Sequence, residues 1–155
     1  MKDQELTGCI SVSDMLVSAS YPKLASKLKP SNYQISCMAL LSESILQRVW
    51  DRFGPIKILS GLRDRRLNKS VGGSDTSDHL FATAADFVTL KKEFDLFYVF
   101  KWMVDMVQYR QLIYYPEKKF IHASVNSPQK DYKHEALIKD KSGIRGWKLE
   151  YTGKP

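Results

Sequence analysis

The chain has 155 residues, the length of one ordinary domain, and its 43% hydrophobic residues are enough for a core without disulfide bonds. Its formal charge of +7 favours an anionic partner such as nucleic acid, a membrane surface or the bacterial cell wall. The basic residues are scattered rather than clustered with aromatic residues, which argues against a nucleic-acid-binding protein. No apolar run approaches the about 18 residues of a membrane span, and residues 1–14 lack the pattern of a signal peptide. We expect a protein made in the cytoplasm without a signal peptide and without membrane insertion.

The first half of the chain predicts two helices and a strand. Residues 11–20 predict a short helix, and residues 32–52 predict the clearest helix, with Gly54-Pro55 after it. The alternating residues 56–59 predict a short strand. Residues 63–76 are charged and contain glycine, and loops of this length are often functional. The long helix should face the core through apolar residues spaced by three or four positions: Ile35, Met38, Leu41, Ile45, Val49 and Phe53.

The second half predicts strands around one more helix. Residues 84–90 predict a strand, and residues 91–108 predict an amphipathic helix. Residues 111–115 and 120–125 predict two strands joined by a connection of hairpin length.

The last part of the chain predicts another hairpin. Residues 136–140 and 146–151 flank Lys141-Ser142-Gly143, which reads as its turn. Together the segments indicate an α+β fold in a single domain spanning residues 1–155, with one mostly antiparallel sheet packed by two main helices.

Three residues have the side chains of a metal site. His79 lies seven positions before Asp86, and His122 lies inside the apolar strand FIHASV. Asp86 is flanked by apolar residues, so a carboxylate buried there needs a cation or several hydrogen-bond donors. Two imidazoles and one carboxylate around an open fourth position are expected of catalytic zinc. Two alternatives stay open: a hydrogen-bonded histidine in the sheet, and an aspartate that caps a helix or pairs with a lysine.

Short motifs surround these residues in a fixed order. They are Ser60-Gly61-Leu62-Arg63, Leu67-Asn68, Val71-Gly72-Gly73, Ser77-x-His79 and Ala84-x-Asp86-Phe87, followed by the strands QLIYY and FIHASV. This order resembles the family of zinc D-Ala-D-Ala carboxypeptidases and L-alanyl-D-glutamate endopeptidases. The resemblance covers about residues 10–130 and leaves the hairpin at 135–151 outside it. It implies a hedgehog-like, D-Ala-D-Ala-peptidase-like fold with the zinc site on the sheet.

The resemblance also implies residue roles. His79, Asp86 and His122 match the three zinc ligands. Arg63 matches an arginine that holds and polarises the peptide, which suits a guanidinium group; the alternative is a solvated loop charge beside Asp64.

Further residues are expected to shape the site or contact the substrate. Ser77 is expected to orient the site through hydrogen bonds and to contact substrate. Tyr115 is expected to line the substrate groove, although strand packing explains it as well. Asn68 and Gly72-Gly73 are expected to shape the loop, because glycine allows backbone angles that other residues avoid.

The chain departs from the family pattern at the general base. Ala82 and Leu62 replace a glycine and a tyrosine, which are small changes. The family carries a glutamate or aspartate shortly before the last zinc histidine, whereas this chain has Lys119 there and Tyr115 where short members often carry glutamate. Glu117 is the only acid nearby and is the candidate catalytic base; the alternative is a turn residue paired with a neighbouring lysine.

The resemblance predicts a zinc-dependent hydrolase that cuts a peptide bond in the stem peptide of bacterial peptidoglycan, of the D-Ala-D-Ala carboxypeptidase or L-Ala-D-Glu endopeptidase type. Zn²⁺ is the expected cofactor, peptidoglycan is the expected partner, and no specific nucleic acid is expected. Compact members are common in bacteriophage genomes, so a lysis protein acting after lysis or export, or a virion-associated protein, is also implied. One alternative is an impaired member serving as a cell-wall-binding or virion structural module. Another is a basic nucleic-acid-associated protein.

Overall fold

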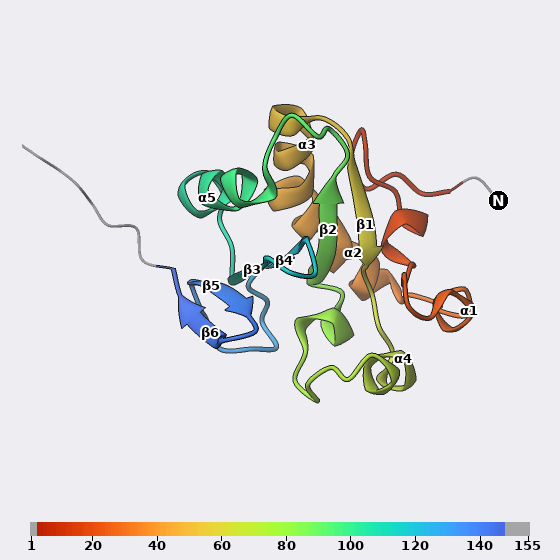
Figure 1. The fold of residues 1–155 in the computed structure, drawn as a ribbon. Helices are drawn as coiled ribbons and strands as arrows, with labels where there is room; N and C mark the ends of the chain where they lie inside the picture. Colours follow the sequence, from red (N-terminus) through yellow and green to blue (C-terminus); the bar gives the residue numbers. More distant parts are fainter. Residues whose placement is uncertain (1–2, 148–155) are drawn as a thin grey trace, which may run out of the picture.

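A six-stranded sheet runs through the computed structural model, which describes residues 3–147 (Figure 1). The strand order is β1-β2-β4-β3-β5-β6, and every neighbouring pair is antiparallel except β3 and β5. This arrangement confirms the predicted single α+β domain with a mostly antiparallel sheet; the closer likeness to a hedgehog-like fold stays a prediction. The strands are β1 (Ile56–Ser60), β2 (Ala84–Thr89), β3 (Gln111–Tyr115), β4 (Phe120–Ser124), β5 (Glu135–Asp140) and β6 (Gly143–Gly146).

The predicted long helix is present as one continuous helical run. It comprises α2 (Asn32–Leu41), a π-helical stretch η2 (Ser42–Leu46) and α3 (Gln47–Phe53). Ser31 begins the run with a capping box, in which its hydroxyl accepts from the backbone of Gln34 and the Gln34 side chain accepts from the backbone of Ser31. The expected apolar stripe is confirmed. Ile35 is partly buried, and the other five members are fully buried: Met38, Leu41, Ile45, Val49 and Phe53.

The helix predicted at residues 91–108 is shorter than expected. It forms α5 (Leu96–Met106), because Asp95 takes the extended conformation of a helix N-cap and the residues before it form a turn. Its apolar side reaches the core, where Phe100 and Met103 are fully buried. In Figure 1, α2 and α3 lie behind β1 and β2, and α5 lies beside them next to β3.

Three short helices were not predicted, and a fourth is shorter than expected. The loop at residues 63–76 contains α4 (Arg65–Ser70), which Asp64 caps by accepting from the backbone of Leu67 at 2.7 Å. It was missed because it is short and charged and buries only Leu67 and Asn68. The other two are α1 (Pro22–Ala25) and the 3₁₀ helix η3 (Asp78–Phe81), whereas the helix expected at 11–20 is the 3₁₀ turn η1 (Ser13–Met15).

The last hairpin begins its second strand earlier than expected. Asp140 pairs with Gly143 across a two-residue turn, so Gly143 belongs to β6 rather than to the turn. The part of the predicted strand at 148–151 lies outside the described residues.

The two faces of the sheet have different roles. Phe87, Leu112, Ile121 and Ala123 are fully buried on the face that the main helices cover. Because side chains alternate along a strand, the neighbours Asp86 and His122 point to the opposite face. The core therefore forms on one face and leaves the other free for a site.

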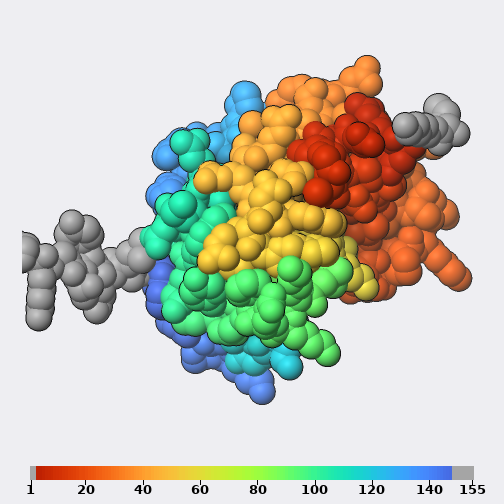
Figure 2. All heavy atoms as spheres, turned by 90° about the horizontal axis from the view of Figure 1, so that it is seen from above, coloured from red at the N-terminus to blue at the C-terminus, as the bar shows by residue number. Residues whose placement is uncertain are grey.

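The N-terminal segment extends the sheet beyond β1. Ser18 forms a bridge with Ser60, and the backbone of Ala19 donates to Leu59 at 2.8 Å. Figure 2 shows this segment in red, packed against the yellow residues around α3 and β1. Among residues 3–147, no helix is both long and apolar enough to span a membrane.

Candidate metal centre and its pocket

The three predicted metal ligands meet on the open face of the sheet. Asp86 on β2 pairs directly with His122 on β4, and η3 brings His79 to the same place. The Oδ1 atom of Asp86 lies 3.2 Å from Nε2 of His79 and 2.8 Å from Nδ1 of His122. One ligand atom from each residue lies within 4.8 Å of the others, so this is a candidate metal-binding group.

The hydrogen bond of His79 to a backbone carbonyl leaves its other ring nitrogen available to a metal ion. Nδ1 of His79 lies 2.7 Å from the carbonyl oxygen of Gly61, which can only accept, so Nδ1 carries the proton. Burial lowers the pKa of the imidazole below its usual value, although Asp86 opposes this effect, so the ring is neutral. Nε2 therefore presents a lone pair to a carboxylate oxygen. A metal ion between the two acceptors removes this repulsion, and a metal-bound histidine commonly donates its other N–H to a carbonyl in this way.

Asp86 is held in its charged form. Burial alone would raise the pKa of its carboxyl, but the adjacent imidazole groups, among them His122 at hydrogen-bond distance, hold the pKa well below its usual range. Its second oxygen, Oδ2, accepts from Nη2 of Arg63 at 3.0 Å, and Arg63 is fixed in turn by donating from Nε to Ser60 at 3.0 Å. The carboxylate thus has one oxygen for Arg63 and one for a metal.

Gly61 is needed at its position for a packing reason. A Cβ atom there would lie 2.2 Å from the backbone oxygen of Met15, which leaves no room for any other residue. This close approach, together with the bond from Leu62 to Met15 at 2.8 Å, sets the position of the carbonyl that holds His79. The role of Gly61 was not foreseen, because the approach joins segments that are distant in the sequence.

The turn that carries His79 is shaped by Ser77 and Ala82. Ser77 caps η3 and accepts from the backbone of His79 at 3.3 Å. Ala82 ends η3 in the left-handed conformation, with φ of 58°. Glycine adopts that conformation without steric cost, so glycine at this position would be favoured over alanine.

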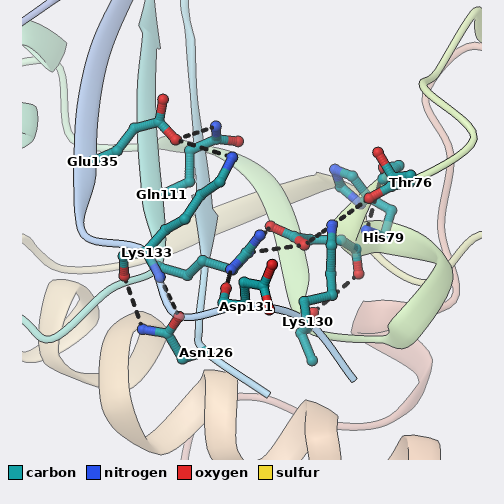
Figure 3. A network of polar contacts seen from close by, with 12 residues as sticks. Thr76, His79, Gln111, Asn126, Lys130, Asp131, Lys133 and Glu135 are labelled. Carbon is teal, nitrogen blue, oxygen red and sulfur yellow. Dashed lines mark hydrogen bonds and ion pairs between the residues drawn. The ribbon is translucent and has the colours of Figure 1, made fainter. Parts of the chain in front are cut away.

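A second buried network lies beside the three ligands (Figure 3). Arg110 donates from Nε to both carboxylate oxygens of Asp78 at 3.2 Å, and both side chains are about 5% exposed. Lys130 also bonds to Asp78 and to the backbone oxygen of Thr76, while Arg110 bonds to the backbone oxygen of Asp131. The connection between β4 and β5 is thereby tied to the turn that carries His79. Sequence reasoning missed this network, because its partners are distant in the sequence.

These elements enclose an open pocket of about 440 Å³. Its wall carries many more cations than acids. The acids are Asp78 and Asp86, and the cations are Arg63, Arg110, Lys118, Lys130, Lys133 and Lys139. A pocket of this charge favours an anionic ligand.

The pocket includes most of the predicted site residues. Arg63, Ser77 and Tyr115 line it together with the three candidate ligands. The Arg63 side chain is 11% exposed and pairs with Asp86, not with Asp64, which caps α4. The Asn68 side chain donates to the backbone oxygen of Ser74 at 2.9 Å and so shapes the loop that leads from α4 toward His79.

Glu117 is not brought to the pocket. It lies exposed in the loop between β3 and β4, and its carboxylate accepts from the backbone of Lys141 at 3.2 Å. Tyr115, at the end of β3, occupies the pocket wall instead.

A comparison with protein families agrees with this site. The model of the family described as peptidase M15 matches residues 12–124, a range that contains all three candidate ligands, Arg63 and strands β1 to β4. A comparison with curated proteins found no match. Since the family match covers well over half of the sequence, the chain belongs to the peptidase M15 family.

Proposed function

We propose that the protein is a zinc-dependent hydrolase that cuts a peptide bond in the stem peptide of bacterial peptidoglycan, as a D-Ala-D-Ala carboxypeptidase or an L-Ala-D-Glu endopeptidase. The observation that carries the proposal is the lone pair of His79 facing the carboxylate of Asp86, with His122 on the other side. Two imidazoles and a carboxylate suit zinc and leave a fourth position for water or substrate. Membership of the peptidase M15 family supports peptide-bond hydrolysis.

The proposed roles follow from the positions of the side chains. Zinc held by His79, Asp86 and His122 would supply a Lewis acid and a bound water of lowered pKa. Arg63 keeps Asp86 oriented and, from the pocket wall, contacts an oxygen of the substrate. Ser77 and Tyr115 contact the peptide from the same wall.

The proposed proton shuttle through Glu117 requires a movement of the loop between β3 and β4. Glu117 acts as the general base only if the loop between β3 and β4 folds over the pocket when substrate binds, because its carboxylate now bonds to Lys141. The exchange Glu117→Gln tests this role: loss of cleavage with zinc retained supports it, and undiminished cleavage excludes it.

One observation favours a second function, that of a cell-wall-binding or virion structural module without turnover. Among the described residues that line the pocket, both carboxylates already have partners: Asp86 pairs with Arg63, and Asp78 pairs with Arg110 and Lys130. Neither is free to take a proton from water. A role in phage lysis, or a place in a virus particle, is compatible with either function.

Two measurements separate these proposals. Metal analysis should find about one zinc per chain, and the His79→Ala variant should bind none. His134 packs on Tyr109 outside the pocket, so the His134→Ala variant should keep its zinc. A purified protein that contains no zinc would contradict the proposed zinc-dependent hydrolase. Digestion of purified peptidoglycan followed by mass spectrometry then decides the rest: new peptide fragments identify a hydrolase and the bond it cuts, and binding without fragments identifies the module.

A further inference from the structure

Two lysines and an aromatic ring form one end of the pocket. Lys118 lies in the loop between β3 and β4, and Lys139 lies on β5. Both ammonium groups lie 5.9 Å from the centre of the Tyr115 ring. That ring stacks on Phe120 at 4.3 Å between centroids and 18° between planes. Stacking holds the ring in place, and both ammonium groups lie at the outer limit of the distance, about 6 Å, at which an aromatic ring attracts a cation.

These two lysines differ from the other cations of the pocket. Arg63 pairs with Asp86, Arg110 and Lys130 pair with Asp78, and Lys133 lies 3.6 Å from Glu135. Among the described residues, no acidic group forms an ion pair with Lys118 or Lys139. The positive charge at this end is therefore unbalanced within residues 3–147. A group of opposite charge on a ligand would balance it.

We propose that Lys118 and Lys139 form a subsite that binds a free carboxylate of the peptide substrate, with the Tyr115 ring against the neighbouring part of the peptide. That the ligand is a peptide rests on the proposed function; that it is an anion rests on the charges alone. The two ammonium groups donate to carboxylate oxygens, and such charge-assisted bonds are the stronger kind. The subsite lies in the same pocket as His79, Asp86 and His122, so it selects peptides with a carboxylate near the bond that is cut.

A peptidoglycan stem peptide with L-lysine at its third position offers this carboxylate at two places. One is the α-carboxylate of its D-glutamate, which is free because the chain continues through the side chain, and the other is the carboxylate of its last D-alanine. Four synthetic pentapeptides distinguish them: the free form, each single amide and the double amide. Amidation removes the charge and changes the size of the group little.

Steady-state kinetics with these peptides tests the subsite. For the wild type, amidation of one of the two carboxylates should raise KM about tenfold, the effect of losing one charge-assisted bond, with little change in kcat. The double variant Lys118→Gln/Lys139→Gln should show the raised KM with the free peptide and no further effect of amidation. Lys141→Gln is the matched control, since it removes the same charge from the nearby β5–β6 turn outside the pocket, and it should behave as the wild type.

Binding measured by calorimetry on the full chain in a chelator makes the test independent of cleavage. The subsite is supported if the wild type binds the free peptide more tightly than its amide and the double variant loses this difference. This result holds even if no bond is ever cut, and in that case only the proposed hydrolase fails. Cleavage that ignores amidation overturns the subsite and leaves the hydrolase standing. Tighter binding of a short single-stranded oligonucleotide than of the free peptide also overturns it, because the two lysines would then serve a nucleic acid.

Discussion

Replacing Asp78 with alanine should lower the free energy of unfolding by about 3 kcal/mol, the lower end of the range for breaking a buried ion pair. The carboxylate accepts two bonds from Arg110 and one from Lys130, and its side chain is 6% exposed. Without it the Arg110 guanidinium stays buried with its charge unpaired. The size of the effect depends on that burial, since exposed pairs contribute little.

Urea denaturation and thermal unfolding measure this loss directly. For a chain of this size, about 3 kcal/mol corresponds to a fall in Tm of roughly 6–12 °C. The matched control is Lys133→Ala, which removes an ion pair with Glu135 whose side chains are 49% and 34% exposed. That exchange should cost at most about 1 kcal/mol. Adding Arg110→Met to Asp78→Ala should restore part of the stability, because the unpaired charge is then removed.

The outcome that contradicts this reasoning is equally specific. If Asp78→Ala costs no more than Lys133→Ala, the pair with Arg110 is open to water in solution. The connection between β4 and β5 would then not be tied to the turn that carries His79, and the cationic wall that this connection contributes to the pocket would be lost.

Three further predictions concern the metal and the backbone. Gly61→Ala should weaken zinc binding about 10- to 100-fold in a competition assay, because a Cβ 2.2 Å from the Met15 oxygen displaces the carbonyl that holds His79. Gly8 has open space around it, so Gly8→Ala should leave the zinc affinity unchanged. Equal zinc affinities of the two variants would contradict this role of Gly61. Zinc at about 100 times its dissociation constant should stabilise the chain by about 2.7 kcal/mol, and an unchanged Tm in chelator would argue against the metal site. Lys119→Gly should raise the free energy of unfolding by about 0.5 kcal/mol, because Lys119 has a φ of 56° and glycine adopts that conformation without steric cost. Lys118→Gly should lower the free energy of unfolding, and the opposite order of the two variants would refute the left-handed conformation of Lys119.

Much of the fold could be read from local patterns. The apolar stripe between Met38 and Phe53 predicted both a helix and its buried side. The alternation in FIHASV places Ile121 and His122 on opposite faces of the strand, and the structure puts Ile121 in the core and His122 on the face that carries the site. Periodicity succeeds here because burial within one element repeats with the geometry of that element. The candidate ligands were identified in the sequence through the resemblance of the ordered motifs to a known family, since residue types and spacing alone left structural roles for the two histidines and the aspartate open.

Other features were decided only by the tertiary structure. The proton position on His79 depends on a carbonyl that Gly61 presents from the end of β1. Whether Glu117 reaches the pocket depends on the path of a hairpin loop, and the loop directs it to Lys141. Which cations of the pocket are left unpaired depends on the distant partners Asp78 and Asp86. Residue types and spacing thus determined which groups are present, whereas strand register and loop path determined which of them meet, because contacts between distant segments leave no periodic trace in the sequence.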